Sequence, residues 1–443
     1  MKKIAWLLSL VFTSGSLYAA DLAQVYRDAQ GNDPTFAAAR ATLEAGRERE
    51  PQGLSGLLPN IALSGNSTWN ENEIDSRTGT FSIKPRYNSN GYTLSLSQPL
   101  FRWQNWVAYE QSKIQVLQAE ANFVQAQQDL VLRVAQAYFD LLYASENLAA
   151  VRANKTAIAQ QLESAKKNFE VGTATITDTH EAQSRYDLAV AQELAAENDL
   201  EVRRRALQAI VGKVPEGLAP LKASVTLSAP QPAGMEKWVE AAEKDSTSVQ
   251  IQQAAADIAA REVERQRAGH YPTVDLVAAK GRSNTFASTG AGILETDFQN
   301  AGVQLNLPLF QGGVVSSRTR EAAANRSAAL SGLEAARRTS ALAARQYYLG
   351  VVSGLAQVKA LEAALASSQL ALESNRLGYE VGVRINIDVL NAEQQVYVTR
   401  RDLAKAKYDT LLAQLRLKAA VGALGEDDVQ QVNALLDSSA TVK

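Results

Sequence analysis

An internal duplication constrains the fold of this chain more than any other feature of its sequence. Three short motifs from the first half return in the second half at an offset of about 210 residues. They are Leu96-Ser-Gln-Pro-Leu-Phe101 with Leu305-Asn-Leu-Pro-Leu-Phe310, Phe169-Glu-Val-Gly172 with Tyr379-Glu-Val-Gly382, and Ile210-Val-Gly212 with Ala420-Val-Gly422. We therefore expect one structural unit to occur twice, over residues 21–230 and 231–443.

Each copy reads as a helix, two strands, a long helix, a turn and a second helix. The strands are expected at about 60–70 and 91–100, and again at about 273–283 and 300–309, and a helical segment over residues 22–50 precedes the first pair. Each strand is a run of about ten residues that alternate apolar and polar between Pro and Gly. This alternation is typical of a transmembrane β-strand. An antiparallel sheet of a soluble domain is the alternative that the strands alone leave open.

Long helices follow each pair of strands. No proline occurs between Phe101 and Pro215, or after Pro308. Residues 104–169 keep a helical pattern, and about 65 residues at 1.5 Å each make a rod of roughly 100 Å. We expect helical hairpins at about 103–212 and 313–422.

The apolar residues of these helices recur every seven positions. The ladders are Leu141, Leu148, Leu162 and Phe169 in the first copy and Val351, Val358, Leu365, Leu372 and Tyr379 in the second. Lys155 interrupts the first ladder at the position where Leu365 continues the second. A period of seven predicts coiled-coil-like packing, and a soluble coiled-coil rod would show the same period.

The first 20 residues read as a secretory signal. Lys2 and Lys3 precede an apolar segment over residues 4–11, and small residues follow up to Ala20. Cleavage after Ala19 and cleavage after Ala20 both fit. No later stretch is expected to cross a membrane as a helix. The chain has no cysteine, which excludes disulfides and thiolate metal sites.

Catalysis is not expected. The two histidines, His180 and His270, occupy non-equivalent positions of the repeat, and no phosphate-binding glycine motif or paired metal-ligand spacing occurs. The formal net charge of -2 provides no general basic surface for nucleic acid. We therefore expect no enzyme activity, no cofactor, no metal site and no nucleic-acid partner.

Three groups of residues carry a resemblance to a known family. They are Asp21-Leu-Ala-Gln-Val-Tyr26, the Pro-Leu-Phe ends of the second strands, and the two helical turns Phe169-Glu-Val-Gly-Thr-Ala-Thr-Ile-Thr-Asp178 and Tyr379-Glu-Val-Gly-Val-Arg-Ile-Asn-Ile-Asp-Val-Leu390. Together with the duplication, these make the chain resemble the TolC family of outer membrane channels over essentially its whole mature length.

The resemblance implies a mainly α fold with a transmembrane β-barrel. Three protomers would each give four strands to one twelve-stranded barrel, continued by a long α-helical barrel through the periplasm. The need to assemble also follows from physics, because four strands leave two open edges that a bilayer does not tolerate. The number three comes from the resemblance alone.

The function that the resemblance implies is an exit duct in the outer membrane of a Gram-negative bacterium, part of a tripartite export system. It would passively conduct drugs or unfolded secreted polypeptides. Its partners would be two further copies of the chain, a periplasmic adaptor, an inner membrane transporter of the RND or ABC type, and outer membrane lipid. A trimeric coiled-coil surface scaffold or adhesin without a channel is the alternative. The cargo and the pump do not follow from the sequence.

The resemblance also implies functional residues. A periplasmic gate of polar links between the repeats would consist of Thr177, Asp178, Tyr379 and Arg384. A pore constriction that attracts cations would consist of Asp388, with Asn391 where the family often has a second acid. The turns that meet the adaptor would be Val171-Gly172 and Val381-Gly382.

Overall fold

The computed structural model describes residues 19–75, 82–213, 217–222, 225–287, 292–437 and 439–440. The chain divides into two compact units. The sheet unit comprises residues 41–123 and 248–337, and the helical unit comprises the described residues within 1–40, 124–247 and 338–443. Each unit therefore takes segments from both predicted repeats.

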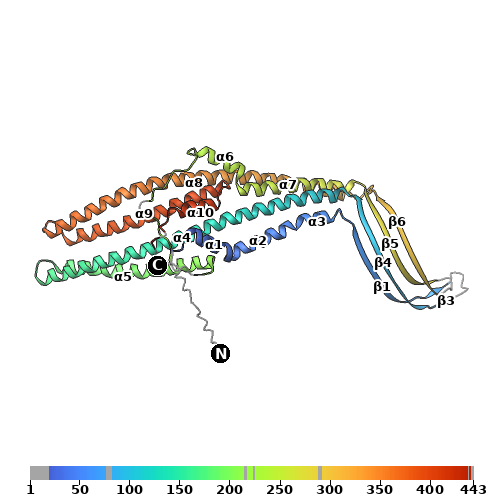
Figure 1. The fold of residues 1–443 in the computed structure, drawn as a ribbon, viewed down its shortest axis with the longest axis horizontal. Helices are drawn as coiled ribbons and strands as arrows, with labels where there is room; N and C mark the ends of the chain where they lie inside the picture. The colour runs from blue at the N-terminus through green and yellow to red at the C-terminus, as the bar shows by residue number, and fades with distance from the viewer. Residues whose placement is uncertain are drawn as a thin grey trace, which may run out of the picture. The chain divides into compact units, whose positions relative to one another are not determined.

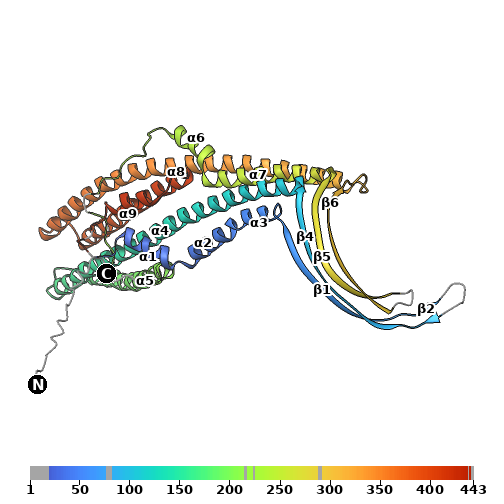
Figure 2. The same cartoon turned by 45° about the vertical axis from the view of Figure 1, so that its right-hand side comes forward.

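The sheet unit is built around four long antiparallel strands. The bounds of its strands are Asn60–Glu71 for β1, Ile74–Asp75 for β2, Ser82–Ile83 for β3, Arg86–Phe101 for β4, Thr273–Ala287 for β5 and Gly292–Asn306 for β6. The long strands pair in the order β1, β4, β5, β6, and they lie side by side and curve along their length (Figures 1 and 2). The pairing of β4 with β5 joins the two predicted repeats.

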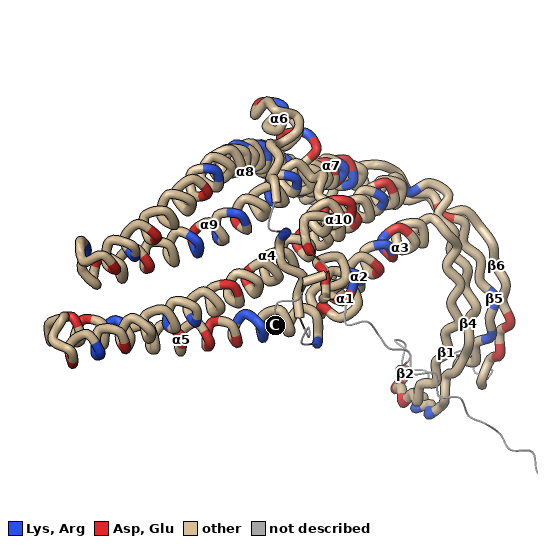
Figure 3. Tube along the Cα trace, turned by 60° about the vertical axis from the view of Figure 1, so that its left-hand side comes forward, with Lys and Arg blue, Asp and Glu red and all other residues tan. Residues whose placement is uncertain are grey.

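The register gives the sheet one apolar face and one polar face. Residues directly opposite each other on neighbouring strands point to the same side, so Leu63 and Leu94 share a face. The residues that line this apolar face include Ile61, Leu63, Leu94, Leu96, Leu276, Val303 and Leu305. The opposite face includes Asn60, Ser64, Thr93, Ser95, Ser97 and Asn300. Toward β2 the same face carries charged side chains. Arg282 and Asp297 lie opposite each other on it and form an ion pair at 2.7 Å, and Figure 3 shows charged residues of the sheet at that end.

The observed strands differ in length from the expected ones. β4 begins at Arg86 rather than near residue 91, β5 continues to Ala287 rather than 283, and β6 covers Gly292–Asn306 rather than about 300–309. The added residues are mostly polar and lack clear alternation, yet they pair with their neighbours in register. β6 stops at Asn306, shortly before Pro308, whose missing N–H cannot extend a ladder.

An ion pair with one buried partner stabilises the sheet unit where β4 leads into a helix. The Arg102 guanidinium, just after β4, donates to both carboxylate oxygens of Asp275 on β5 at 2.7 Å each. Asp275 is 7% exposed, so this bidentate pair supplies the hydrogen bonds that a buried carboxylate requires.

The helices include two hairpins close to the ranges expected at about 103–212 and 313–422, together with helices that had no expected range. Their bounds are Leu22–Asn32 for α1, Pro34–Arg47 for α2, Arg49–Ser55 for α3, Trp103–Glu170 for α4, Ile176–Val211 for α5, Met235–Asp245 for α6, Thr247–Arg267 for α7, Val314–Glu380 for α8, Asn386–Ala420 for α9 and Glu426–Asn433 for α10, with a 3-10 turn at Ala268–His270. The segment expected as one helix over residues 22–50 is broken into α1, α2 and the start of α3. Asp33 ends α1 and its carboxylate caps α2 by accepting from the backbone N–H of Thr35 and Phe36.

The helical unit consists mainly of two hairpins, α4 with α5 and α8 with α9. The heptad ladders are buried within it at Leu141, Leu148, Leu162, Val351 and Val358. Burying a side chain of this size contributes roughly 1.5 to 3 kcal/mol. Phe169 departs from the prediction, because it is 43% exposed at the end of its helix.

A second heptad series on α8 is exposed in the single chain. Its members are Leu342, Leu349, Leu370 and Leu377, each more than half exposed. Among the described residues, α8 is also the one helix with an 18-residue window apolar enough to cross a membrane by length and composition, with a mean hydropathy of 1.4. The expectation that no such stretch follows the signal is therefore wrong by this measure. The apolar residues that line up for helix-to-helix contact are the same ones that raise the hydropathy.

Candidate functional site

The two hairpin turns have the same backbone structure. At the first turn Gly172 has a φ of 76°, and at the second Gly382 has a φ of 78°. The N–H of Thr173 donates to Asn168 O, and that of Val383 donates to Gly378 O. A positive φ suits glycine because it has no Cβ. These bonds satisfy the last carbonyls of α4 and α8.

Exposed apolar side chains gather at these turns. Val171 is 73% exposed, and Val381, Val383 and Ile385 are each more than 60% exposed. Water-exposed valine and isoleucine at adjacent positions are typical of a contact surface for another protein.

The Asp178 carboxylate is hydrogen-bonded at the start of its own helix. Its carboxylate accepts from the backbone N–H of Thr175 at 2.9 Å and from the Thr175 hydroxyl at 2.8 Å, and the Asp178 N–H donates back to that hydroxyl. This is a capping box at the start of α5. Thr177 lies exposed on the same first turn.

Tyr379 and Arg384 have partners other than the predicted ones. The Tyr379 hydroxyl accepts from the Asn168 amide at 3.1 Å, which joins α8 to α4. Arg384 lies 3.6 Å from the carboxylate of Asp388. Within the described part of this single chain, no hydrogen bond or ion pair joins Asp178 to Tyr379 or to Arg384. The structure thus places the four predicted gate residues at the hairpin tips but does not link them to each other.

Polar contacts that the sequence did not predict join the two hairpins. The partners are Glu146 with Tyr408, Asn147 with Tyr397, Gln161 with Asn386, Asn168 with Tyr379, and Arg185 with Asn391. The sequence carries a signal for three of the four α4 members, because Asn147, Gln161 and Asn168 belong, with Asn154, to a series with a spacing of seven residues. Each precedes a position of the apolar ladder by one residue. We call this series the amide ladder.

The contact farthest from the tips involves a buried tyrosine, Tyr408, which is 3% exposed. The Tyr408 hydroxyl donates to the Glu146 carboxylate at 2.6 Å, and the Tyr408 ring packs 5.4 Å from that of Phe139. Burial raises the pKa of the Glu146 carboxyl, while the Tyr408 hydrogen bond and nearby Lys407 oppose the shift. A raised pKa means that this site favours the folded state more at acid pH and loses that advantage as pH rises through it.

The two predicted constriction residues lie close together on α9, and Asn391 carries a contact from the other hairpin. Asp388 is one-third exposed beside Arg384. The Arg185 guanidinium of α5 donates to the Asn391 side-chain oxygen at 2.8 Å. An arginine of the first hairpin therefore binds the side chain of the second predicted constriction residue.

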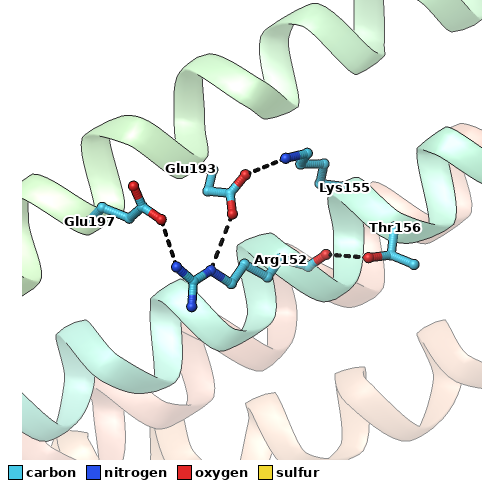
Figure 4. A network of polar contacts seen from close by, with 5 residues as sticks. All are labelled: Arg152, Lys155, Thr156, Glu193 and Glu197. Carbon is cyan, nitrogen blue, oxygen red and sulfur yellow. Dashed lines mark hydrogen bonds and ion pairs between the residues drawn. The ribbon is translucent and has the colours of Figure 1, made fainter. Parts of the chain in front are cut away.

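The first hairpin is held together by a charged network (Figure 4). Arg152 of α4 binds Glu193 and Glu197 of α5 at 3.1 and 2.6 Å, and Lys155 binds Glu193 at 2.6 Å. The hydrogen bond from Lys155, followed by that from Arg152, lowers the pKa of the Glu193 carboxyl. Lys155, which interrupts the apolar ladder, thus has a defined partner.

Comparison with known proteins identifies the family. The family model described as outer membrane efflux protein matches residues 25–213 and 238–423. The chain belongs to this family. It is 34% identical over 424 residues to the outer membrane protein TolC of Vibrio cholerae, covering 95% of each chain. It is 33% identical over 445 residues to the alkaline protease secretion protein AprF of Pseudomonas aeruginosa, covering 99% of this chain and 92% of that protein.

Solved structures of outer membrane channels share the fold. The structure of VceC from Vibrio cholerae has a TM-score of 0.76 at 21% identity and covers 90% of this chain and 96% of its own. That of the CmeC channel from Campylobacter jejuni has a TM-score of 0.78 at 17% identity and covers 94% and 90%. The outer membrane efflux protein family is one of transport ducts, not of enzymes, so this chain is an exit duct of the Gram-negative outer membrane.

Proposed function

We propose that three copies of this chain form one outer membrane duct, in which three four-stranded sheets close a twelve-stranded barrel. The observation that carries the proposal is the sheet itself. β1 and β6 end the strand order, so within the described residues each has an edge without a partner strand. Neighbouring copies can satisfy both edges by pairing β1 of one with β6 of the next.

The apolar surfaces support the same assembly. Ile61, Leu63 and Leu305 on the apolar face are each about two-thirds exposed or more, which suits contact with lipid. The polar face would then line a water-filled lumen. The exposed heptad series Leu342, Leu349, Leu370 and Leu377 would pack against a helix of the neighbouring copy and continue an α-helical barrel in the periplasm.

We propose that the hairpin tips form the gate. Asn168 with Tyr379 is the tip contact that joins the two hairpins of one chain, and it is a neutral hydrogen bond that water can replace. Thr177, Asp178 and Arg384 lie at the same tips with part of their hydrogen-bonding capacity free for a neighbouring copy. Opening would separate the hairpins, starting from the tips and moving toward Glu146 and Tyr408.

The partner that opens this gate would be a periplasmic adaptor that binds the turns at Val171-Gly172 and Val381-Gly382. The exposed valines there support that role. An inner membrane transporter of the RND or ABC type would deliver the cargo. One relative is named for the secretion of alkaline protease, so unfolded polypeptides are one proposed cargo and small drugs are the other.

Three measurements on the purified protein test the duct, the trimer and the docking surface. Purified protein in a planar bilayer should give stepwise current, and light scattering should give the mass of a trimer. Because the chain has no cysteine, a Val383→Cys variant carries a single attachment point for a crosslinker that should capture the adaptor. A scaffold or adhesin would form a trimer without current, and a stable folded monomer would refute the shared barrel. Current without an adaptor crosslink would leave the duct standing and reject the docking surface.

A further inference from the structure

Arg185 is the charged residue that connects the first hairpin to the proposed pore constriction. Its guanidinium donates to the Asn391 side-chain oxygen at 2.8 Å, from α5 to α9. Asn391 lies three residues after Asp388, so the two project from nearly the same face of α9. The Arg185 side chain is 30% exposed, which leaves part of the guanidinium open to solvent.

Asp388 and Arg185 each have an oppositely charged neighbour on their own helix or turn. Asp388 has Arg384 at 3.6 Å, and Arg185 has Glu181 at 3.8 Å, one turn earlier on α5. Each of these two pairs is neutral in sum, and so is the pair of Glu393 with Arg376 at 2.7 Å two residues beyond Asn391, which itself adds no charge. The Asn391 oxygen, the one atom there that could imitate a second acid, is turned toward a guanidinium.

A constriction that selects cations requires carboxylates that are not neutralised nearby. Rings of acids favour cations, and rings of arginine or lysine favour anions. Charges within a Debye length, about 8 Å at physiological ionic strength, act on a passing ion together. Arg185 binds Asn391, and Asn391 lies about one helical turn after Asp388, so the guanidinium offsets the field of the carboxylate.

We propose that Arg185 sets the ion selectivity of the constriction, with three copies adding a ring of positive charge beside Asp388. This rests on the proposed function, because it requires a trimeric channel that narrows at Asp388. The duct is then nearly unselective between small cations and anions. It admits anionic cargo, such as acidic polypeptides or small molecules with carboxylate groups, that a ring of unbalanced acids would repel.

The test is the reversal potential of single channels in a tenfold KCl gradient. Arg185→Gln keeps an amide N–H for Asn391 but removes the charge. We expect a reversal potential near zero for the wild type, and an increase in the potassium to chloride permeability ratio of at least about threefold in the variant. Lower salt should enlarge the difference because screening weakens.

A matched control lies on the same helix. Arg205→Gln removes the same charge 20 residues further along α5, about 30 Å away, where Arg205 pairs with Glu201. It should leave the reversal potential unchanged. Arg185→Lys should keep the wild-type value, because the charge is retained.

Several results would overturn the proposal. A wild type that strongly prefers potassium would do so, as would an Arg185→Gln channel with wild-type selectivity or an Arg205→Gln channel shifted equally. If Arg185→Gln does not assemble, Asn391→Asp adds a negative charge at the same contact and must shift selectivity toward potassium. Absence of any wild-type current would instead reject the channel itself.

Discussion

Single polar side chains at the hairpin tips take the nearest suitable partner. Asp178 lies three residues after Thr175, so the capping box forms within one helical turn. Arg384 lies four residues before Asp388 and pairs with it. A short-range partner requires little additional ordering of the chain, whereas a link to another helix requires both helices to be in place. Tyr379 has no such local partner and reaches Asn168 on the other hairpin.

The Tyr379 hydroxyl is therefore predicted to hold the tips together. Tyr379→Phe removes that hydroxyl but keeps the ring, and the loss of its half-buried hydrogen bond should cost about 1 kcal/mol. We expect a higher time-averaged conductance of the isolated channel, and a further rise when Arg384→Ser is added. Trimer stability should change little. The measurement is long bilayer recordings beside thermal denaturation of the trimer.

The control for this change is Tyr186→Phe. Tyr186 packs against Ile158 and Leu162, and its hydroxyl has no hydrogen-bond partner among the described residues, so its conductance should equal that of the wild type. Wild-type conductance in the Tyr379→Phe Arg384→Ser channel would contradict a role of these two residues in holding the gate closed. Loss of the trimer in that variant would mean that Tyr379 acts by packing.

The two hairpins are equivalent elements that are held together by different chemistry. In the first, Lys155 and Glu193 form an ion pair. At the positions 210 residues later, Leu365 packs against the buried Leu403. Beside them, Glu362 and Lys407 pair at 3.1 Å, which is the contact of Arg152 with Glu197 with its charges reversed. The duplicated helices thus pack in the same way, but an ion pair in the first hairpin occupies the positions of an apolar contact in the second.

Replacing the ion pair of the first hairpin with the leucine pair of the second should preserve the stability of the protein. Lys155→Leu with Glu193→Leu places the pair of the second hairpin in the first, and we expect a melting temperature equal to or above that of the wild type. Lys155→Leu alone should lower it, because Glu193 loses a partner in a site where its side chain is only 16% exposed. Circular dichroism during heating measures both.

The stability of the wild type and that of the double variant should respond differently to acid pH. The lowered pKa of Glu193 means that the ion pair stabilises the wild type at neutral pH and that this contribution is lost as pH falls through the lowered value. The double variant has no carboxyl group at position 193, so it should not lose stability in this way. A double variant less stable than the single one would contradict the exchange, and so would an identical acid response in double variant and wild type.

The molecule as a whole leaves two kinds of surface unsatisfied in the single chain: the open edges of the sheet and the exposed apolar side chains of the sheet and of α8. Neither is stable in water over such an area. In the proposed assembly, a bilayer would cover the apolar face of the sheet, and neighbouring copies would pair with the strand edges and pack against the α8 series. Lipid and water would then contact opposite faces of the same four strands.

Substitution on the two faces of one strand tests this arrangement. Leu94→Arg should reduce insertion by ~2 to 4 kcal/mol if the residue lies near the bilayer midplane. Thr93→Arg is the matched control, because the adjacent side chain points to the polar face and its charge stays in water. The yield of folded trimer in outer membranes measures both. Equal yields would contradict the lipid assignment of the apolar face, and loss of Thr93→Arg alone would mean that the faces are reversed.

The elements of this fold are determined locally by the sequence. Periods of two and of seven follow from the geometry of strand and helix. The alternation around Leu94 therefore predicted which side chains share the apolar face of the sheet, and the ladder through Leu148 and Val351 predicted which helix positions are buried. The turns at Gly172 and Gly382 were also predictable from local sequence, because a backbone with positive φ favours glycine in any context. Strand starts were missed where polar residues follow no alternation, as between Arg86 and Gly91.

The pairing of polar side chains was decided by the tertiary structure. Asn391 and Arg185 are far apart in the sequence, and either could have had solvent as its partner, as could Tyr379 and Asn168. A hydrogen bond needs its two atoms within a few tenths of an ångström of one distance, and only the packing of α4 and α5 against α8 and α9 sets that distance. The sequence by itself determined the repeated helices and strands, while the contacts of the proposed gate and constriction depended on how the two hairpins pack.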